Sequence, residues 1–398
     1  MPASMKKVCR GLRKQRHECA SAAMTQDGGS LPEASSSRKE GVVAPTLAIL
    51  HAAGAKTRQQ QESGMRIVVY GAGSIGCYVG GRLLASGSDV HLIARPRVAD
   101  QIARQGLHLS DYRGYAARLP PSCVPVSTSA EAIDSADLVL VTVKSAATPD
   151  VAATLAGRLR PGAMVLSLQN GLHNAAQLEA ALPAQIVLAG MVPFNVVQLA
   201  QSHFHQGSEG ELVAAENISL FHALPAFNAA GLPLQLEADM KAVQWAKLLL
   251  NLNNAVNALS GLPLKTELEQ RDYRRVLSAA QREALALLAQ TAQPLARLTP
   301  LPPSLLPTLL TVPDWVFRRA AQRLLAIDPQ ARSSMWEDLE AGRRTEIDFI
   351  NGEVVKLAEA LGQTAPVNAA LIRLVRAAEN GGRRNWSGRE LLAAVQGS

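Results

Sequence analysis

Residues 66–76 read Arg-Ile-Val-Val-Tyr-Gly-Ala-Gly-Ser-Ile-Gly, a short apolar run that ends in three spaced glycines. The run predicts a buried strand, and the small residues that follow it, as far as Ala85, predict a helix. In this context the glycines allow a tight turn, a close approach of the backbone to a ligand, and close packing of helix on strand. A helix N-terminus in this position binds the phosphates of a dinucleotide. The predicted contacts to such a cofactor are Gly71, Ala72, Gly73, Ser74, Ile75 and Gly76.

Further apolar stretches extend this strand–helix pattern into an α/β fold with a parallel sheet. From about Asp239 the pattern becomes helical almost to the C-terminus. We therefore expect a Rossmann-type sheet domain over residues 65–238 and an all-α domain over residues 239–398. The later strands are predicted at Asp89–Ile93, Leu138–Val143, Met164–Leu168 and Ile186–Val192.

Charge and composition exclude several classes of protein. The chain has 398 residues and a formal charge of +7, but residues 1–64 hold ten Lys/Arg against five Asp/Glu, which leaves the rest nearly neutral. The basic excess therefore gives no support for a nucleic-acid partner. No apolar run reaches the roughly 18 residues of a membrane span, and the four cysteines lack a spacing typical of zinc sites or disulfide frameworks. We expect a cytoplasmic protein with no metal and no membrane partner.

Residues 1–64 show no sustained periodicity, and three interpretations stay open. The basic start, Met1–Arg16, resembles an organelle transit peptide. The lack of periodicity also fits a disordered segment. The interpretation that we favour is that translation begins at Met65, directly before the first predicted strand.

The end of the second predicted strand indicates which dinucleotide binds. An NAD site usually carries Asp or Glu about 20 residues after the glycines, where it accepts hydrogen bonds from the ribose. Here that strand ends in Leu-Ile-Ala-Arg95, with Arg97 just beyond and no acid in between. A guanidinium suits the 2′-phosphate of NADP(H), which is therefore favoured over NAD(H). The alternative for Arg95 is a solvated loop cation.

Polar residues follow two other predicted strands. Asn170, in Gln-Asn-Gly, comes straight after one strand, and Lys144 ends another. Carboxyl ends of parallel strands line the ligand crevice in such folds. Both residues are thus predicted to face the cofactor, with Asn170 also near the substrate. The alternatives are a simple Asn-Gly turn and a surface lysine.

A lysine and two amides share one face of an otherwise apolar predicted helix, residues 245–254. At about 100° per residue, Asn251 and Asn254 fall within roughly 40° of Lys247. A single lysine there would usually extend to solvent. The asparagines on the same face instead favour a binding site.

Together these landmarks resemble the ketopantoate reductase family (2-dehydropantoate 2-reductase), from Met65 to about Arg376. The most specific matches are Ser-Ser334-Met and Arg-Arg-Thr-Glu346-Ile-Asp-Phe-Ile-Asn-Gly. The other matching segments are the glycine motif, Val-Thr-Val-Lys144, Gln-Asn170-Gly and Lys247-Leu-Leu-Leu-Asn251.

The resemblance implies an active site in the cleft between a Rossmann domain and a helical domain. It implies NADPH-dependent reduction of ketopantoate to (R)-pantoate, in pantothenate and coenzyme A biosynthesis. Lys247 matches the proton donor, and Glu346 matches a glutamate at the cofactor and active site. Glu346 would hold the lysine or a substrate hydroxyl in place. The implied substrate contacts are Asn170, Asn251, Asn254 and Ser334, and the segment Pro193–Val197, with Val196, would pass the nicotinamide.

Some departures leave the substrate open. Residue 255 is Ala where the family commonly has a second asparagine, so Asn254 or Asn257 would replace it. Leu264 stands where some members have a polar substrate contact, and Pro294–Pro313 is longer than in compact members. The alternatives are a related dehydrogenase of another 2-keto or 3-hydroxy acid, and a non-catalytic NADP(H)-binding regulator. The apolar helices of the second domain also allow a homodimer.

Overall fold

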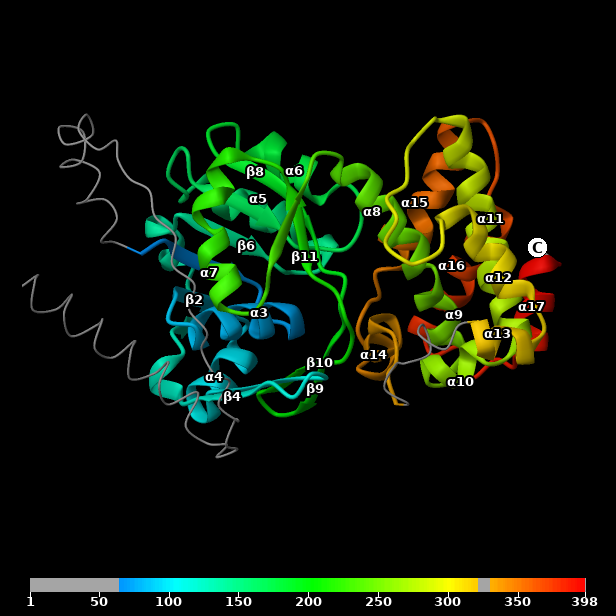
Figure 1. Cartoon of the computed structure of the whole chain (residues 1–398), viewed down its shortest axis with the longest axis horizontal. Helices are drawn as coiled ribbons and strands as arrows, with labels where there is room; N and C mark the ends of the chain where they lie inside the picture. The colour runs from blue at the N-terminus through cyan, green and yellow to red at the C-terminus, as the bar shows by residue number, and fades with distance from the viewer. Residues whose placement is uncertain (1–63, 321–329, 398) are drawn as a thin grey trace, which may run out of the picture.

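The computed structural model describes residues 64–320 and 330–397. It contains a sheet half on one side and a helical half on the other (Figure 1). The last strand of the sheet half ends at Glu237, and the first helix of the other half begins at Met240. The expectations for residues 1–63 lie outside the described residues.

The main sheet has eight strands in the order β12-β11-β8-β7-β6-β1-β2-β5. The predicted strands are confirmed, although three of them end one or two residues earlier than predicted. The expected Rossmann-type parallel sheet is confirmed, with one antiparallel pair, because β11 runs antiparallel to β8 after the chain returns from a second sheet. The strands are β1 (Arg66–Tyr70), β2 (Asp89–Ile93), β5 (Val126–Ser127), β6 (Leu138–Val141), β7 (Met164–Ser167), β8 (Ile186–Met191), β11 (Leu212–Ala215) and β12 (Leu234–Glu237).

The position of β1 in this order determines where a ligand can bind. From β1 the chain goes first to β2 on one side and later to β6 on the other, and both pairs are parallel. The helices that follow these strands therefore diverge and leave a crevice at the carboxyl ends of β1 and β6. The glycine motif begins at this end of β1.

The second sheet has four strands in the order β4-β3-β10-β9 and was not predicted. Helix α3 (Ser74–Ala85) lies between the two sheets, and small residues bring it close to both. A Cβ on Gly80 would lie 2.6 Å from Leu92 of the main sheet, and one on Gly81 would lie 2.9 Å from Leu109 of the second. The strands are β3 (Leu107–Asp111), β4 (Ala116–Leu119), β9 (Val196–Ala200) and β10 (His203–Gln206).

Both faces of the main sheet are covered, so its central strands β6 and β7 are buried along their whole length. Helix α3 and the second sheet cover one face, while α5 and α6 bury apolar residues such as Leu155 and Leu178 on the other. Each such fully buried leucine contributes about 1.5–3 kcal/mol through burial. The remaining helices of this half are α4 (Pro96–Gln105), α5 (Thr148–Ala156), α6 (Asn174–Ala181) and α7 (Leu224–Ala229).

The helical half has its own apolar core. The single helix predicted over residues 245–254 is in fact two helices, because α8 ends at Asn251 and α9 begins at Asn253. The helices are α8 (Met240–Asn251), α9 (Asn253–Ser260), α10 (Leu264–Leu268), α11 (Arg271–Gln290), α12 (Leu306–Thr311), α13 (Asp314–Ala320), α14 (Ser334–Glu340), α15 (Ile347–Ala360), α16 (Pro366–Glu379) and α17 (Gly388–Gln396).

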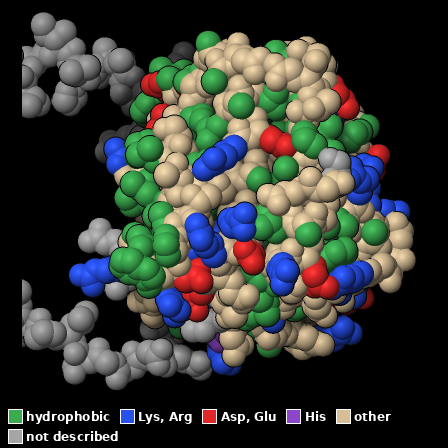
Figure 2. All heavy atoms as spheres, turned by 90° about the vertical axis from the view of Figure 1, so that its right-hand side faces the viewer, with side chains coloured by type: hydrophobic (Ala, Val, Ile, Leu, Met, Phe, Trp, Pro, Cys, Tyr) green, Lys and Arg blue, Asp and Glu red, His purple; other side chains and the backbone are tan. Residues whose placement is uncertain are grey.

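The proline-rich segment Pro294–Pro313 packs on this half. Ala296 N donates to the carbonyl oxygen of Ala242 on α8 over 3.2 Å. The buried Arg274 of α11 donates to the carbonyl oxygens of Leu310 and Val312. On the outer face of the helical half, charged side chains of both signs are interspersed with apolar ones (Figure 2). The homodimer stays a prediction.

Candidate active site

The glycine turn after β1 is held by the ends of both neighbouring strands. Gly71 has a φ of +111°, a conformation that favours glycine. Its N–H and that of Ala72 each donate to the carbonyl oxygen of Ile93 at the end of β2, over 3.1 Å. A Cβ on Gly71 would lie 2.6 Å from Val143, just beyond β6. The turn is therefore fixed at the middle of the crevice.

The helix that follows offers free donors to this crevice. Gly73 is the N-cap of α3 and carries no capping side chain. The N–H groups of the first turn, at Ser74, Ile75 and Gly76, have no partner within the helix. A Cβ on Gly76 would overlap the carbonyl oxygen of Gly71. The predicted glycine motif thus forms a cradle that fits a dinucleotide pyrophosphate.

Arg95 lies on the same edge of the sheet, directly after β2, and its side chain is exposed. No acidic residue stands between Ile93 and Ala99, so the surroundings fit a ribose phosphate better than a free ribose. Val196, which the family resemblance places beside the nicotinamide, begins β9 and is buried in the core of the sheet half. Its contact with the cofactor stays a prediction.

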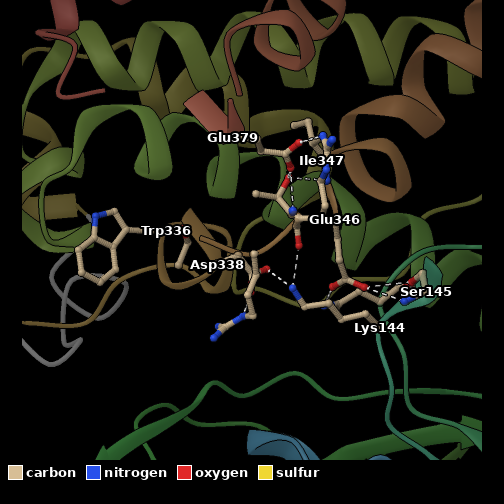
Figure 3. A network of polar contacts seen from close by, with 12 residues as sticks. Lys144, Ser145, Trp336, Asp338, Glu346, Ile347 and Glu379 are labelled. Carbon is tan, nitrogen blue, oxygen red and sulfur yellow. Dashed lines mark hydrogen bonds and ion pairs between the residues drawn. The ribbon is translucent and has the colours of Figure 1, made fainter. Parts of the chain in front are cut away.

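Lys144 also follows a crevice strand, but its ammonium group is bonded to the helical half. Its Nζ lies 2.6 Å from Asp338 Oδ2 on α14 and donates to the carbonyl oxygen of Arg344 over 2.9 Å (Figure 3). The residue predicted to contact the cofactor is thus part of a bridge between the two halves.

Lys247 lies on α8, where that helix faces β8 and the segment after it. Its Nζ donates to the carbonyl oxygen of Pro193 over 3.3 Å, and burial lowers the pKa of its ammonium group to about 8. A narrow pocket joins this lysine to the end of β7. It is lined by Gln169, Asn170, Gly171, Gly190, Met191, Val192, Gln244, Lys247, Leu248, Asn251, Phe349 and Ile350.

Glu346, the residue just before α15, joins the helical half to two strand ends. One carboxylate oxygen accepts from the backbone N–H of Ser145 over 3.0 Å, and the other accepts from Asn170 Nδ2 over 3.1 Å (Figure 3). Among the described residues, the structure gives Glu346 no bond to Lys247, and the alternative that it holds a substrate hydroxyl stays a prediction. Glu346 instead fixes the amide that lines the pocket.

The predicted substrate residues are not all in the same place. Asn251 lines the pocket together with Lys247. Asn254 and the exposed Ser334 lie farther along, at the start of α9 and of α14, and neither lines the pocket. Asn254 and Ser334 as substrate contacts stay predictions.

Asn257 has a structural role. It is fully buried, its Nδ2 donates to Glu267 Oε2 over 2.7 Å, and its Oδ1 accepts from the N–H of Ser333 over 2.9 Å. Of the two candidates for the family's second asparagine, Asn257 thus has both ends of its amide engaged, whereas the side chain of Asn254 makes no hydrogen bond to the described residues.

Two residues of this region were missed from the sequence. Ser145 bonds to Glu346, and Asp338 bonds to Lys144 and to Arg343. The position of Ser145 after a crevice strand was the one available signal. The charge of Asp338 gave no signal of a functional role, because a solvent-exposed helix face would carry the same residue.

Comparisons with known proteins agree with this geometry. Two family models match the chain: "Ketopantoate reductase PanE/ApbA" over residues 67–217 and "Ketopantoate reductase PanE/ApbA C terminal" over residues 239–379. A 2-dehydropantoate 2-reductase of Halobacterium salinarum is 31% identical over 80% of this chain and 100% of its own length. The chain belongs to the ketopantoate reductase family.

Other ketopantoate reductases are similar over the same region. The 2-dehydropantoate 2-reductase of Archaeoglobus fulgidus is 28% identical over 79% of this chain and 98% of its own length. The crystal structure of a ketopantoate reductase from Ralstonia eutropha has a TM-score of 0.68 and 32% identity, covering 80% of this chain and 99% of that one. A D-mandelate dehydrogenase structure, at 19% identity and a TM-score of 0.65, shares the fold.

Membership of the ketopantoate reductase family makes the chain an NAD(P)-dependent oxidoreductase that acts on CH–OH groups. Within residues 64–320 and 330–397, no cluster of His, Cys, Asp and Glu is suited to a metal ion. In the same ranges, no helix combines the length and the apolar character that crossing a bilayer requires.

Proposed function

We propose that the protein reduces 2-dehydropantoate to (R)-pantoate with NADPH, a reaction of pantothenate and coenzyme A biosynthesis. One observation carries the proposal. The buried amine of Lys247 lines a narrow pocket together with the amides of Asn170 and Asn251, next to the dinucleotide crevice. A keto acid needs such a combination, with a proton donor for its carbonyl oxygen and neutral donors for its other oxygens.

The residues that would hold the cofactor are the first turn of α3, Arg95 and, at the nicotinamide end, Asn170. When bound, NADPH supplies the hydride for the 2-keto carbon. Negative charge then develops on the carbonyl oxygen, and the Lys247 ammonium group stabilises that charge and donates the proton. A positioned acid of this kind contributes about 10²–10⁴-fold to the rate.

The pKa of Lys247 suits this role. At about 8 it keeps the amine mostly protonated at neutral pH, yet weakens its hold on the proton compared with an exposed lysine. Glu346 holds Asn170 toward the pocket, and Asn251 is one helical turn from the lysine. Asn254 and Ser334 would orient the far end of the substrate.

The proposal also covers the choice of cofactor, for which Arg95 is the main support. Its guanidinium would pair with the 2′-phosphate of NADPH, which NADH lacks. NADH as the physiological cofactor is the alternative.

A second candidate function is reduction of another 2-keto acid or oxidation of a 3-hydroxy acid. The favouring observation is apolar side chains at two positions where the family carries polar substrate contacts. Ala255 is fully buried and Leu264 is partly buried at the start of α10. Neither side chain is part of the lining of the pocket, so these two positions supply no polar contact to a substrate.

One experiment tests these proposals together. The full chain is assayed for oxidation of NADPH and of NADH with 2-dehydropantoate and a small panel of 2-keto acids, and for reduction of NADP⁺ with 3-hydroxy acids. The highest kcat/KM for 2-dehydropantoate with NADPH is expected. A higher value for another acid would establish the second candidate. Binding of NADPH without turnover of any acid would show a non-catalytic regulator.

A further inference from the structure

Lys144 is placed where the phosphates of a dinucleotide are expected. It comes three residues after β6, which pairs with β1, so it lies on the same edge of the sheet as the glycine turn. Arg95 follows β2 on the other side of β1. The two cations thus flank the cradle formed by the first turn of α3.

The bonds of Lys144 run to the opposite half of the molecule. Its Nζ lies 2.6 Å from Asp338 Oδ2 and 2.9 Å from the carbonyl oxygen of Arg344, both in the helical half (Figure 3). Two of its three ammonium donors are therefore used to join the halves. The Lys144 side chain is 42% exposed, whereas that of Asp338 is only 7% exposed.

Asp338 forms an ion pair with a second basic residue, Arg343. Arg343 Nε donates to Asp338 Oδ1 over 3.0 Å, while Lys144 pairs with Oδ2. If Lys144 turned away, the buried carboxylate would keep this pair and would not be left as an isolated charge, which is the costly situation in a protein interior. The geometry therefore allows Lys144 to break its ion pair with Asp338.

We propose that Lys144 exchanges between Asp338 and a phosphate of the dinucleotide. Asp338 then competes with the cofactor for this lysine, and cofactor binding releases one ionic bond between the two halves. Asp338 acts here as a positioning residue that lowers the affinity for the dinucleotide. This inference rests on the proposed function, because it requires that the crevice binds NADPH.

The test is a double-mutant cycle on the binding of NADPH to the full chain, measured by titration calorimetry without substrate. Asp338→Asn should lower the Kd about two- to fivefold, the range expected for loss of a partly exposed ion pair. Lys144→Met should raise the Kd. In the Lys144→Met background, Asp338→Asn should have no effect, because Asp338 acts through the lysine.

Two further variants control the comparison. Glu340→Gln removes the same charge from α14 at an exposed position that pairs with Arg384, and it should leave the Kd unchanged. Arg343→Met removes the second cation of Asp338, so that the carboxylate pairs with Lys144 alone and holds it more strongly. This variant should therefore raise the Kd for NADPH, and it gives a test even if Asp338→Asn does not fold. Circular dichroism and thermal melting check each variant for folding.

The outcomes separate this inference from the proposed function. Unchanged or weaker binding of NADPH by folded Asp338→Asn would overturn it, since weaker binding would mean that Asp338 orients the lysine for the cofactor. A lower Kd after Arg343→Met would also overturn it. A wild-type chain that binds neither NADPH nor NADH would instead refute the proposed function.

Discussion

Replacing Lys247 by Met should abolish turnover and at the same time stabilise the fold. Burial lowers the pKa of the Lys247 ammonium group from 10.5 to about 8. At 1.36 kcal/mol per unit, keeping it charged in the fold costs about 3 kcal/mol at neutral pH. Methionine has a similar shape and loses one hydrogen bond, to the carbonyl oxygen of Pro193, worth about 1 kcal/mol. The expected gain in the free energy of unfolding is therefore about 2 kcal/mol.

The sign of the pH dependence follows from the same shift. Because the folded-state pKa lies below the unfolded one, the unfolded chain binds more protons between pH 8 and pH 10.5. The wild-type protein should gain stability as the pH rises through this window, and the advantage of Lys247→Met should vanish by its upper end. The activity of the wild type should fall over the same pH window, because the neutral lysine has no proton to donate. We expect kcat/KM to drop about tenfold per pH unit above pH 8.

The assay is denaturant unfolding of both proteins at several pH values, combined with NADPH binding and turnover. Lys241→Met is the matched control, since Lys241 is an exposed lysine on the same helix and should change neither property. A Lys247→Met protein less stable than wild type at neutral pH would refute the argument from burial. Near-normal kcat in that variant would refute the assignment of Lys247 as the proton donor.

Three further substitutions test other parts of the structure. Arg95→Ala should raise the KM for NADPH and leave that for NADH unchanged, and equal changes in both would show that Arg95 does not read the 2′-phosphate. Gly76→Ala places a Cβ against the carbonyl oxygen of Gly71, so titration calorimetry should show that dinucleotide binding is lost. Unfolding curves should show a decrease of about 1–3 kcal/mol in the free energy of unfolding. Normal dinucleotide binding by this variant would contradict the expected overlap. Burial raises the pKa of Glu267 to about 8, so wild-type stability should fall as the pH rises from 4.5 to 8. Glu267→Gln should remove that slope, and parallel stability profiles of the two proteins would disprove it.

The strands that line the crevice could be predicted because they are apolar on both faces and end at glycine or polar residues. β1 and β6 are examples, with a continuous buried run in each. The second sheet could not be predicted, since strands such as β10, His-Phe-His-Gln, bury a single apolar side chain, Phe204, together with the polar Gln206, and leave both histidines half-buried. The division between α8 and α9 at Leu252 was also hidden, because no proline or glycine interrupts the apolar periodicity there.

The candidate site was predictable where a single strand end or helix face displays it. Asn170, Lys247 and Asn251 are of this kind, and the structure brings them to one pocket. The bonds of Glu346 and Lys144 were not predictable, because their partners lie about 200 residues away along the chain. These residues can be recognised in the sequence, but their bonding partners depend on how the two halves pack against each other, which the sequence pattern does not reveal.

The chain passes from the strands to the helices once, in the two residues between β12 and α8. A cut at that point would give two fragments, each with a nearly complete apolar core. Among the described residues, a small apolar cluster would span the division, with Met191 and Val213 on one fragment and Met240 and Val243 on the other, and Leu172 of the first fragment would pack on the core of the second. We infer that separately produced fragments could reassemble, and that the reconstituted enzyme would depend on their concentration as the intact chain does not.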